Sequence, residues 1–200
     1  MSLAIVEVGN PVLRRAARPL SPEEIRSPEI QKLIAAMRET MHEAPGVGLA
    51  APQVGHSIQL AVIEDRPQYH KDIAPEQLAA KERRPVPFHV LVNPRLVWQS
   101  DQVREFFEGC LSLPDYTAVV RRAHAVKVEC LDDTGKARSI EANGWYARIL
   151  QHEIDHLQGR LYIDRMESRS FSALNNFSEF WKSRPITDVL REIGPSESKG

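Results

Sequence analysis

The segment 152–156 has the sequence His-Glu-Ile-Asp-His, a His-Glu-x-x-His pattern that can bind a metal ion. Four residues of α-helix rotate by about 400°, so His156 returns to within about 40° of His152 one turn later. Both imidazoles could then bind one ion from the same face. Glu153 lies about 100° round that helix, a poor position for a ligand but a suitable one for a base acting on bound water. The alternative is a surface helix with two solvated histidines, and the motif alone does not name a reaction.

A metal site on this motif needs a third protein ligand, because catalytic zinc-type sites usually take three protein ligands and one water. Downstream, Asp164 and Glu167 are weak candidates. Cys110 is another, because it follows a glycine in the segment Glu-Gly-Cys-Leu-Ser at 108–112, and a thiolate beside a cation would be deprotonated. The residues alone support a ligand and a structural role equally for Cys110. Cys130 alternates with two valines on a predicted strand, which predicts a buried side chain.

A third unusual segment is Gly-Val-Gly-Leu-Ala-Ala-Pro-Gln, at 46–53. It lacks the pattern of a phosphate-binding loop. Its two glycines would let the backbone come close to another group, so it could be the edge of a substrate site with the Gln53 amide directed inward. A tight connection packed against a sheet explains the same residues, and the sequence does not decide between these interpretations.

Three helices are predicted around these segments. The first, at about 27–44, has a serine N-cap followed by proline, and its apolar residues recur at helical spacing. The second, at about 143–158, carries the two histidines, with Asn143 as its N-cap and Gly159 as a left-handed stop. A third is expected at about 170–182 from its periodic aromatic and apolar residues.

Between the first two helices, runs rich in valine, isoleucine and aromatic residues predict strands at 59–64, 89–98, 103–107, 117–122, 125–131 and 136–142. The polar stretch 65–87 is too long for a tight hairpin, so we expect a surface excursion with a helical turn around 75–81. Strands in the middle and helices at the ends favour an α+β fold. We expect one catalytic domain over 1–184 and a flexible C-terminal tail over 185–200.

Composition narrows the class of protein. The 200 residues carry a formal net charge of −1 without a dense basic run, which argues against direct nucleic-acid binding. Two cysteines are too few for a disulfide scaffold of this length. The sequence shows no signal-peptide pattern and no apolar run of membrane-span length, so we expect a cytoplasmic protein with reduced thiols that does not bind membranes.

Taken together, the segments 46–53, 108–112 and 151–157 resemble, in order and spacing, the three signature motifs of the peptide deformylase family. The similarity covers about residues 1–170, and the ordered triple is highly specific. The resemblance implies antiparallel β-sheets packed around a central helix that bears the two histidines, with an N-terminal and a C-terminal helix. The excursion at 65–87 is longer than in many bacterial members and is similar to that of the organellar subgroup.

The resemblance implies a hydrolase that removes the N-formyl group from the N-terminal formyl-methionine of nascent proteins and releases formate. Cys110, His152 and His156 would bind one divalent metal ion with a water in the fourth position. In the family this ion is typically Fe²⁺ in the cell, and Zn²⁺, Ni²⁺ or Co²⁺ can replace it; a thiolate with two imidazoles would also suit zinc. Glu153 corresponds to the general acid and base.

The resemblance also implies the residues that contact substrate. Gln53 and the backbone N–H of Leu111 correspond to the donors that stabilise the oxyanion. Four further residues correspond to the substrate-binding edge and the pocket for the methionine side chain: Gly46, Gly48, Trp145 and Ile149. The implied partners are N-formylmethionyl nascent peptides, with the ribosome as a candidate place of encounter.

Two competing functions and one supporting contact follow from the same residues. A zincin-like peptidase would need a third ligand other than Cys110. A deformylase-like protein that binds metal or nascent chains without turnover would have no need of Glu153 and Gln53, which are both present. We also expect Asp155, on the inward side of the histidine helix, to form an ion pair with Arg122, because an unpaired carboxylate there would be costly.

Overall fold

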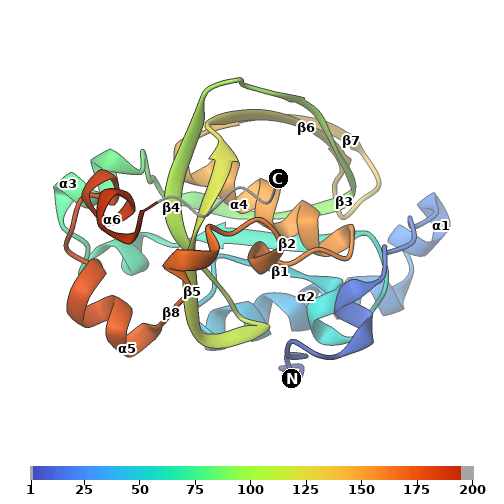
Figure 1. The fold of residues 1–200 in the computed structure, drawn as a ribbon. Coiled ribbons are helices and arrows are strands. Elements are labelled where there is room, and N and C mark those ends of the chain that lie inside the picture. The colour runs from blue at the N-terminus through green and yellow to red at the C-terminus, as the bar shows by residue number, and fades with distance from the viewer. Residues whose placement is uncertain (1, 195–200) are drawn as a thin grey trace, which may run out of the picture.

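The computed structural model describes residues 2–194, and its strands curve around one buried helix (Figure 1). The strands are β1 (Gly48–Ala50), β2 (Leu60–Asp65), β3 (Val86–Gln99), β4 (Val103–Cys110), β5 (Leu113–Ala123), β6 (Ala125–Leu131), β7 (Ala137–Asn143) and β8 (Ser172–Ala173). The helices are α1 (Pro22–Ile25), α2 (Pro28–Glu43), α3 (Pro75–Ala80), α4 (Gly144–Leu157), α5 (Leu174–Asn176) and α6 (Ile186–Ile193).

The strands form two antiparallel sheets. The larger has the order β1-β2-β3-β6-β7 and the smaller the order β4-β5-β8. Helix α4 contacts strands of both, and Figure 1 shows β6 and β7 arching over one side of α4 with β1 and β2 on the other. The long strand β3 pairs with both β2 and β6. The predicted α+β fold is therefore confirmed.

Helix α4 is buried around most of its circumference. Ten of its fourteen residues are buried, which excludes a solvated surface helix as the setting of the two histidines. Gly159 follows with a φ of +73°, which confirms the predicted left-handed stop. Asn143 is the N-cap residue, as predicted, but its side chain makes no capping bond: its amide donates instead to Glu82 Oε2 at 3.4 Å.

The other helix predicted before the strands is confirmed as α2. The Ser27 hydroxyl accepts a hydrogen bond from the backbone N–H of Ile30, which caps the helix. Met37 and Met41 are fully buried in the cluster that joins α2 to β1 and β2, so they are core residues.

The C-terminal region differs from the prediction. The helix expected at 170–182 begins instead as β8, which pairs with β5, and continues as α5 and a π-helical segment at Phe177–Trp181. Pairing with the free edge of β5 outweighs the helical periodicity there. Residues 185–200 were expected to form a flexible tail, but Ile186–Ile193 form α6, whose Val189 side chain is buried. Residues 195–200 lie outside the described part of the chain.

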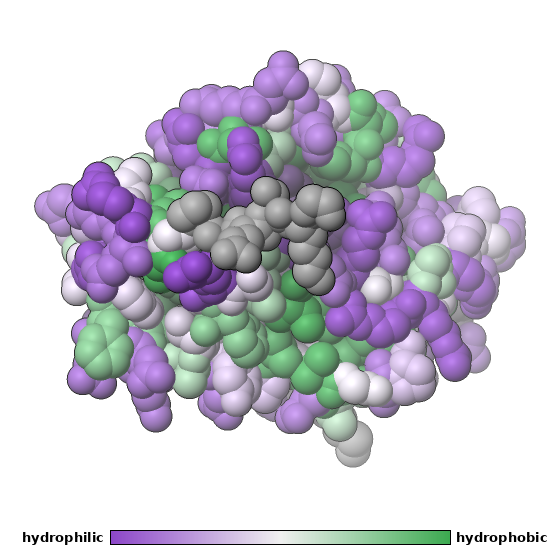
Figure 2. Space-filling model, viewed as in Figure 1, coloured by the Kyte–Doolittle hydropathy of each residue, from purple (hydrophilic) through white to green (hydrophobic). Residues whose placement is uncertain are grey.

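The remaining sequence expectations concern the strands, the excursion and the surface. All six predicted strands are present, several of them longer than predicted, and α3 lies where a helical turn was expected in the excursion. Cys130 is buried, as predicted. Among residues 2–194, no helix has both the length and the apolar character needed to cross a bilayer. Figure 2 shows hydrophilic side chains over most of one face, with hydrophobic side chains at its lower centre and in smaller groups near the top.

Candidate active site

Three potential metal ligands converge from two elements. His152 and His156 lie one turn apart on α4, and Cys110 is the last residue of β4. The Nε2 atoms of the two histidines are 3.2 Å apart, and His156 Nε2 lies 3.3 Å from Cys110 Sγ. All three ligand atoms lie within 4.8 Å of one another. The fold therefore brings together the three residues that the family resemblance implied as ligands.

This donor set fits a divalent metal ion. Tetrahedral coordination, with about 2.0–2.1 Å to nitrogen and about 2.3 Å to sulfur, holds ligand atoms about 3.3–3.6 Å apart. The observed spacings of 3.2 and 3.3 Å are close to these values. Burial holds the pKa of His156 well below its usual range, so its imidazole is neutral near pH 7, the form that binds metals.

Glu108 orients the first histidine. Its Oε2 atom lies 3.0 Å from His152 Nδ1, which leaves Nε2 directed at Cys110 and His156. Burial alone would raise the pKa of Glu108, but the charge and hydrogen bonds of Arg122, together with those of His152, hold it well below its usual range. Glu108 is therefore ionised and accepts the proton on His152 Nδ1.

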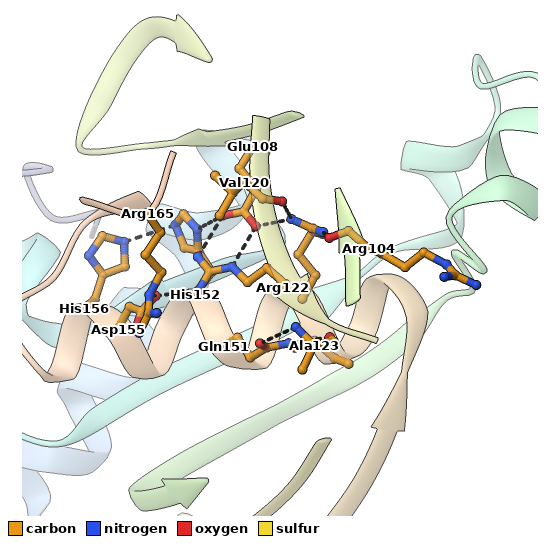
Figure 3. A network of polar contacts seen from close by, with 12 residues as sticks. Arg104, Glu108, Val120, Arg122, Ala123, Gln151, His152, Asp155, His156 and Arg165 are labelled. Carbon is orange, nitrogen blue, oxygen red and sulfur yellow. Dashed lines mark hydrogen bonds and ion pairs between the residues drawn. The ribbon is translucent and has the colours of Figure 1, made fainter. Parts of the chain in front are cut away.

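Behind the site, Glu108 belongs to a network of buried ion pairs, which Figure 3 shows. Arg122 donates from Nε and Nη2 to the two oxygens of Glu108 at 2.9 Å each, and from Nη1 to Asp155 Oδ2. Arg165 donates to both oxygens of Asp155, at 2.8 and 2.9 Å. The predicted Asp155–Arg122 ion pair is confirmed, and it joins α4 to β5 behind His152.

Arg148 completes this network on the side of the cavity. It donates to Glu108 Oε1 at 2.6 Å and to the carbonyl oxygens of Val120 and Arg104 at 2.9 and 2.7 Å. Neither Glu108 nor Arg148 was predicted from the sequence as a site residue. Helical spacing could have indicated Arg148, because it precedes His152 by four residues and so shares its face of α4.

Glu153 lies beside the three ligand atoms. Its side chain lines the same cavity, is only 3% exposed, and its Oε2 has no hydrogen-bond partner among residues 2–194. Burial raises the pKa of Glu153 to about 7, partly opposed by His152. Gly48 of β1 packs directly against it, since a Cβ at position 48 would lie 2.2 Å from Glu153 Oε1. A carboxyl that exchanges a proton near pH 7 is suited to general acid–base chemistry.

Gln53 also lies beside the thiol of Cys110. Its Oε1 accepts from the backbone N–H of Ala50 at 2.9 Å, which fixes the amide so that Nε2 lies 3.5 Å from Cys110 Sγ and 3.2 Å from Ser112 Oγ. Leu111 lies in the turn between β4 and β5 and lines the same cavity. The Gln53 amide and the Leu111 segment thus lie on the wall that also carries Cys110.

The N-terminal segment contacts both the segment that carries Gln53 and the turn that follows Cys110. The backbone N–H of Val6 donates to the carbonyl of Gln53 at 2.8 Å, and that of Val8 donates to the carbonyl of Ser112 at 2.7 Å. The segment therefore ties the loop that carries Gln53 to the hairpin that carries Cys110.

The site opens into a cavity of about 560 Å³, within the usual range for small-ligand sites. His152, Glu153 and Cys110 line one part of it. The remaining residues expected to contact substrate also line this cavity: Gly46, Gly48, Trp145 and Ile149. His156 does not line it and lies deeper, 1% exposed. The structure thus places all the predicted site residues at or directly behind one opening.

Comparison with known proteins identifies the family. The model of the family described as "Polypeptide deformylase" matches residues 2–172. The chain is 45% identical over 172 residues to "Peptide deformylase 1A, chloroplastic" of Solanum lycopersicum, covering 86% of this chain and 62% of that protein. It is 46% identical over 186 residues to "Peptide deformylase 3" of Streptomyces avermitilis, covering 93% of this chain and 80% of that one. The chain thus spans just under two thirds of the length of the tomato relative.

Solved structures agree. A class I type b peptide deformylase from Acinetobacter baumannii, crystallised with Met-Ala-Ser bound, superposes with a TM-score of 0.74 at 36% identity, covering 83% of this chain and 99% of that one. The deformylase of Thermotoga maritima gives a TM-score of 0.69 at 34% identity, covering 83% and 98%. The shared fold, the ordered motifs and the match over residues 2–172 lead to one conclusion: the chain belongs to the polypeptide deformylase family.

Proposed function

We propose that this protein hydrolyses the N-formyl group of the N-terminal formyl-methionine of nascent proteins and releases formate. The observation that carries the proposal is the arrangement of a Cys/His/His donor set beside a buried glutamate of raised pKa, in one cavity of a deformylase-family chain. The relatives named peptide deformylase support the same reaction.

Cys110, His152 and His156 would hold one divalent metal ion, Fe²⁺ in the cell, with Zn²⁺, Ni²⁺ or Co²⁺ able to replace it. When bound, such an ion supplies Lewis-acid polarisation of the formyl oxygen and makes water a stronger nucleophile at neutral pH. Glu108 fixes the tautomer of His152, and the charge pairs behind it keep the ring in place.

Glu153 would serve twice as the carrier of a proton. Its carboxylate accepts the proton that water loses when it attacks the formyl carbon, and a pKa near 7 makes the acid form stable enough to hold it. The acid then gives the proton to the departing amine, which is a poor leaving group unless it is protonated. Gly48 leaves the space in which the carboxyl group does this.

Gln53 and Leu111 would stabilise the oxyanion that develops on the formyl oxygen. The Gln53 amide is held by the Ala50 N–H, so its donor is already oriented before substrate binds. Gly46 and Gly48 would form the edge that holds the peptide backbone. Trp145 and Ile149 would contact the methionine side chain, since a thioether packs favourably against an aromatic ring.

The setting of the reaction forms part of the same proposal. Residues 1–184 would form the catalytic domain, and formylmethionyl nascent peptides would be the substrates, met at the ribosome in the cytoplasm. Neither nucleic acid nor membrane is an expected partner, given the formal net charge of −1 and the lack of a basic run.

The test is formate release from formyl-Met-Ala-Ser by protein purified and loaded with Fe²⁺ without oxygen. We expect turnover with the formylated peptide and no cleavage of peptide bonds in an unformylated control. Peptide-bond cleavage without formate release would favour a zincin-like peptidase. Stoichiometric metal binding without either reaction would favour a binding protein that lacks turnover.

A further inference from the structure

The end of the excursion between β2 and β3 packs against the first turn of α4. Three consecutive residues make the contact, Lys81, Glu82 and Arg83. Gly144, the first residue of α4, lies so close to them that a Cβ there would be 2.6 Å from Glu82 Cβ and 2.9 Å from the Lys81 carbonyl oxygen. The end of the excursion is therefore packed onto the helix that carries the histidines.

Arg83 is held in place by a buried acid. Its Nε and Nη2 atoms donate to the two oxygens of Asp65 at 2.8 and 2.9 Å. Asp65 is 0% exposed and also lies 3.0 Å from His70 Nε2, another residue of the excursion. A bidentate pair of this kind fixes both the position and the plane of the guanidinium group.

The fixed guanidinium faces the cavity of the active site. Arg83 lines that cavity, and its Cζ lies 5.5 Å from the centre of the Trp145 ring, which also lines it. Lys81 Nζ lies 4.5 Å from the centre of the same ring. Glu82 fastens the segment between them through His124 Nε2 at 2.7 Å and the Asn143 amide at 3.4 Å.

We propose that Arg83, positioned by Asp65, is a specificity-determining residue that forms the outer wall of the pocket for the first side chain of the substrate. The inference rests on the proposed function for the identity of the substrate. The guanidinium holds Trp145 from outside and so limits the width of the pocket to an unbranched side chain. Because Arg83 belongs to the excursion, that segment would form part of the substrate site and would not be only a surface loop.

The experiment compares two substrates that differ only in the first side chain, formyl-Met-Ala-Ser and formyl-Phe-Ala-Ser, by kcat/KM. Arg83→Ala removes the wall and should lower the preference for methionine by about 10-fold or more, the size of effect that a change of one or a few methylenes makes in an apolar pocket. Asp65→Asn keeps Arg83 but loosens it, so the preference should fall by less, through KM and not kcat. Arg84→Ala is the matched control, because Arg84 is exposed and next in sequence.

Binding of the products provides a second measurement. Calorimetric titration with Met-Ala-Ser and Phe-Ala-Ser should show the same loss of discrimination in Arg83→Ala and none in Arg84→Ala. Unchanged discrimination in both measurements, in folded variants with full metal content, would overturn the inference. If the wild type released no formate from either peptide, the proposed function would fail, and the product affinities would still decide the role of Arg83. If Arg83→Ala did not fold, Asp65→Asn would provide the decisive comparison.

Discussion

The position of the Glu153 carboxyl group requires a glycine at position 48. The carboxyl group of Glu153 fills the space that a side chain at position 48 would need, so the glycine is required by close packing on a catalytic candidate. The same crowding excludes solvent from Glu153, and burial raises its pKa to about 7.

Replacing Glu153 by glutamine tests its role as a proton carrier. The amide is nearly isosteric but cannot accept a proton from water, so Glu153→Gln should retain the metal and lose about 100- to 10,000-fold in kcat. Metal content and formate release should be measured on the same preparation. Activity near that of the wild type at full metal content would remove Glu153 from the reaction.

The two cysteines provide an internal comparison for the metal site. Cys110 lies with two imidazoles, whereas Cys130 is buried on β6. Cys110→Ala should lose the metal or bind it weakly, and Cys110→Ser should shift any retained metal towards zinc, because a hydroxyl is a harder and less acidic donor. Cys130→Ser should change neither metal content nor turnover. If Cys110→Ala bound one metal ion and turned over like the wild type, another third ligand would exist.

At the scale of elements, α4 is braced against β5 by charges that are almost fully buried. Arg122 on β5 reaches both Glu108 on β4 and Asp155 on α4, so one guanidinium joins three elements directly behind His152. Arg122 neutralises the charges of Glu108 and Asp155, and Glu108 in turn orients His152. Removal of Arg122 should therefore affect both stability and metal binding.

Arg122→Met should therefore destabilise the fold, by up to about 3–5 kcal/mol, because Glu108 and Asp155 lose the buried cation that they share. Arg148 would remain as a partner of Glu108, and Arg165 as a partner of Asp155. Metal affinity should fall by about 10- to 100-fold, since the support of His152 is lost. Urea unfolding of the metal-free protein and competition with a chelator measure the two effects separately. Arg121→Met, at the exposed neighbouring position, is the control. Unchanged metal affinity in Arg122→Met would show that the network serves stability alone.

The contact between the excursion and α4 predicts a dependence of stability on pH. Burial, together with the charges of Arg83 and Arg148, lowers the pKa of Lys81 from 10.5 to about 8. Between those values the unfolded chain binds more protons than the folded one, so the contribution of Lys81 to stability rises with pH in that window. Lys81→Met removes a buried charge, so its gain in stability over wild type should be largest at pH 7 and shrink towards pH 10.5. Urea unfolding at both pH values tests this, with the exposed Lys71→Met as control. A gain that is independent of pH would contradict the lowered pKa.

The sequence predicted those elements whose periodicity and capping are local, and missed those decided by distant partners. The spacing of His152 and His156 was sufficient to place them on one face of a helix. Strand β8 exists because Ser172 and Ala173 pair with β5, about 55 residues earlier in the chain, and nothing in the local pattern indicates that partner. Arg83 could not be assigned either, because its acid, Asp65, and its aromatic neighbour, Trp145, are distant from it in sequence.

At the scale of the whole molecule, the proposed metal site would join the smaller sheet, through Cys110 on β4, to the central helix α4. A ligand that binds only the folded chain stabilises it, by about 2.7 kcal/mol at a free concentration 100 times Kd. Removal of the metal should therefore lower the midpoint of thermal unfolding, and restoring excess metal should return it. The Cys110→Ala protein should show little change between the two conditions. Equal melting temperatures for wild type with and without metal would indicate that the ion does not bind this site.

The hydrogen bonds of Val6 and Val8 have a consequence for the order in which the protein is made. Val6 and Val8 are synthesised before their partners, the carbonyls of Gln53 and Ser112. The donor set in turn is complete only when His156 has been synthesised. Contacts of such large sequence separation form slowly and late, because the intervening chain must be ordered first. We therefore expect the hydrogen bonds of Val6 and Val8, like the donor set, to form only after the later residues of the site have been synthesised.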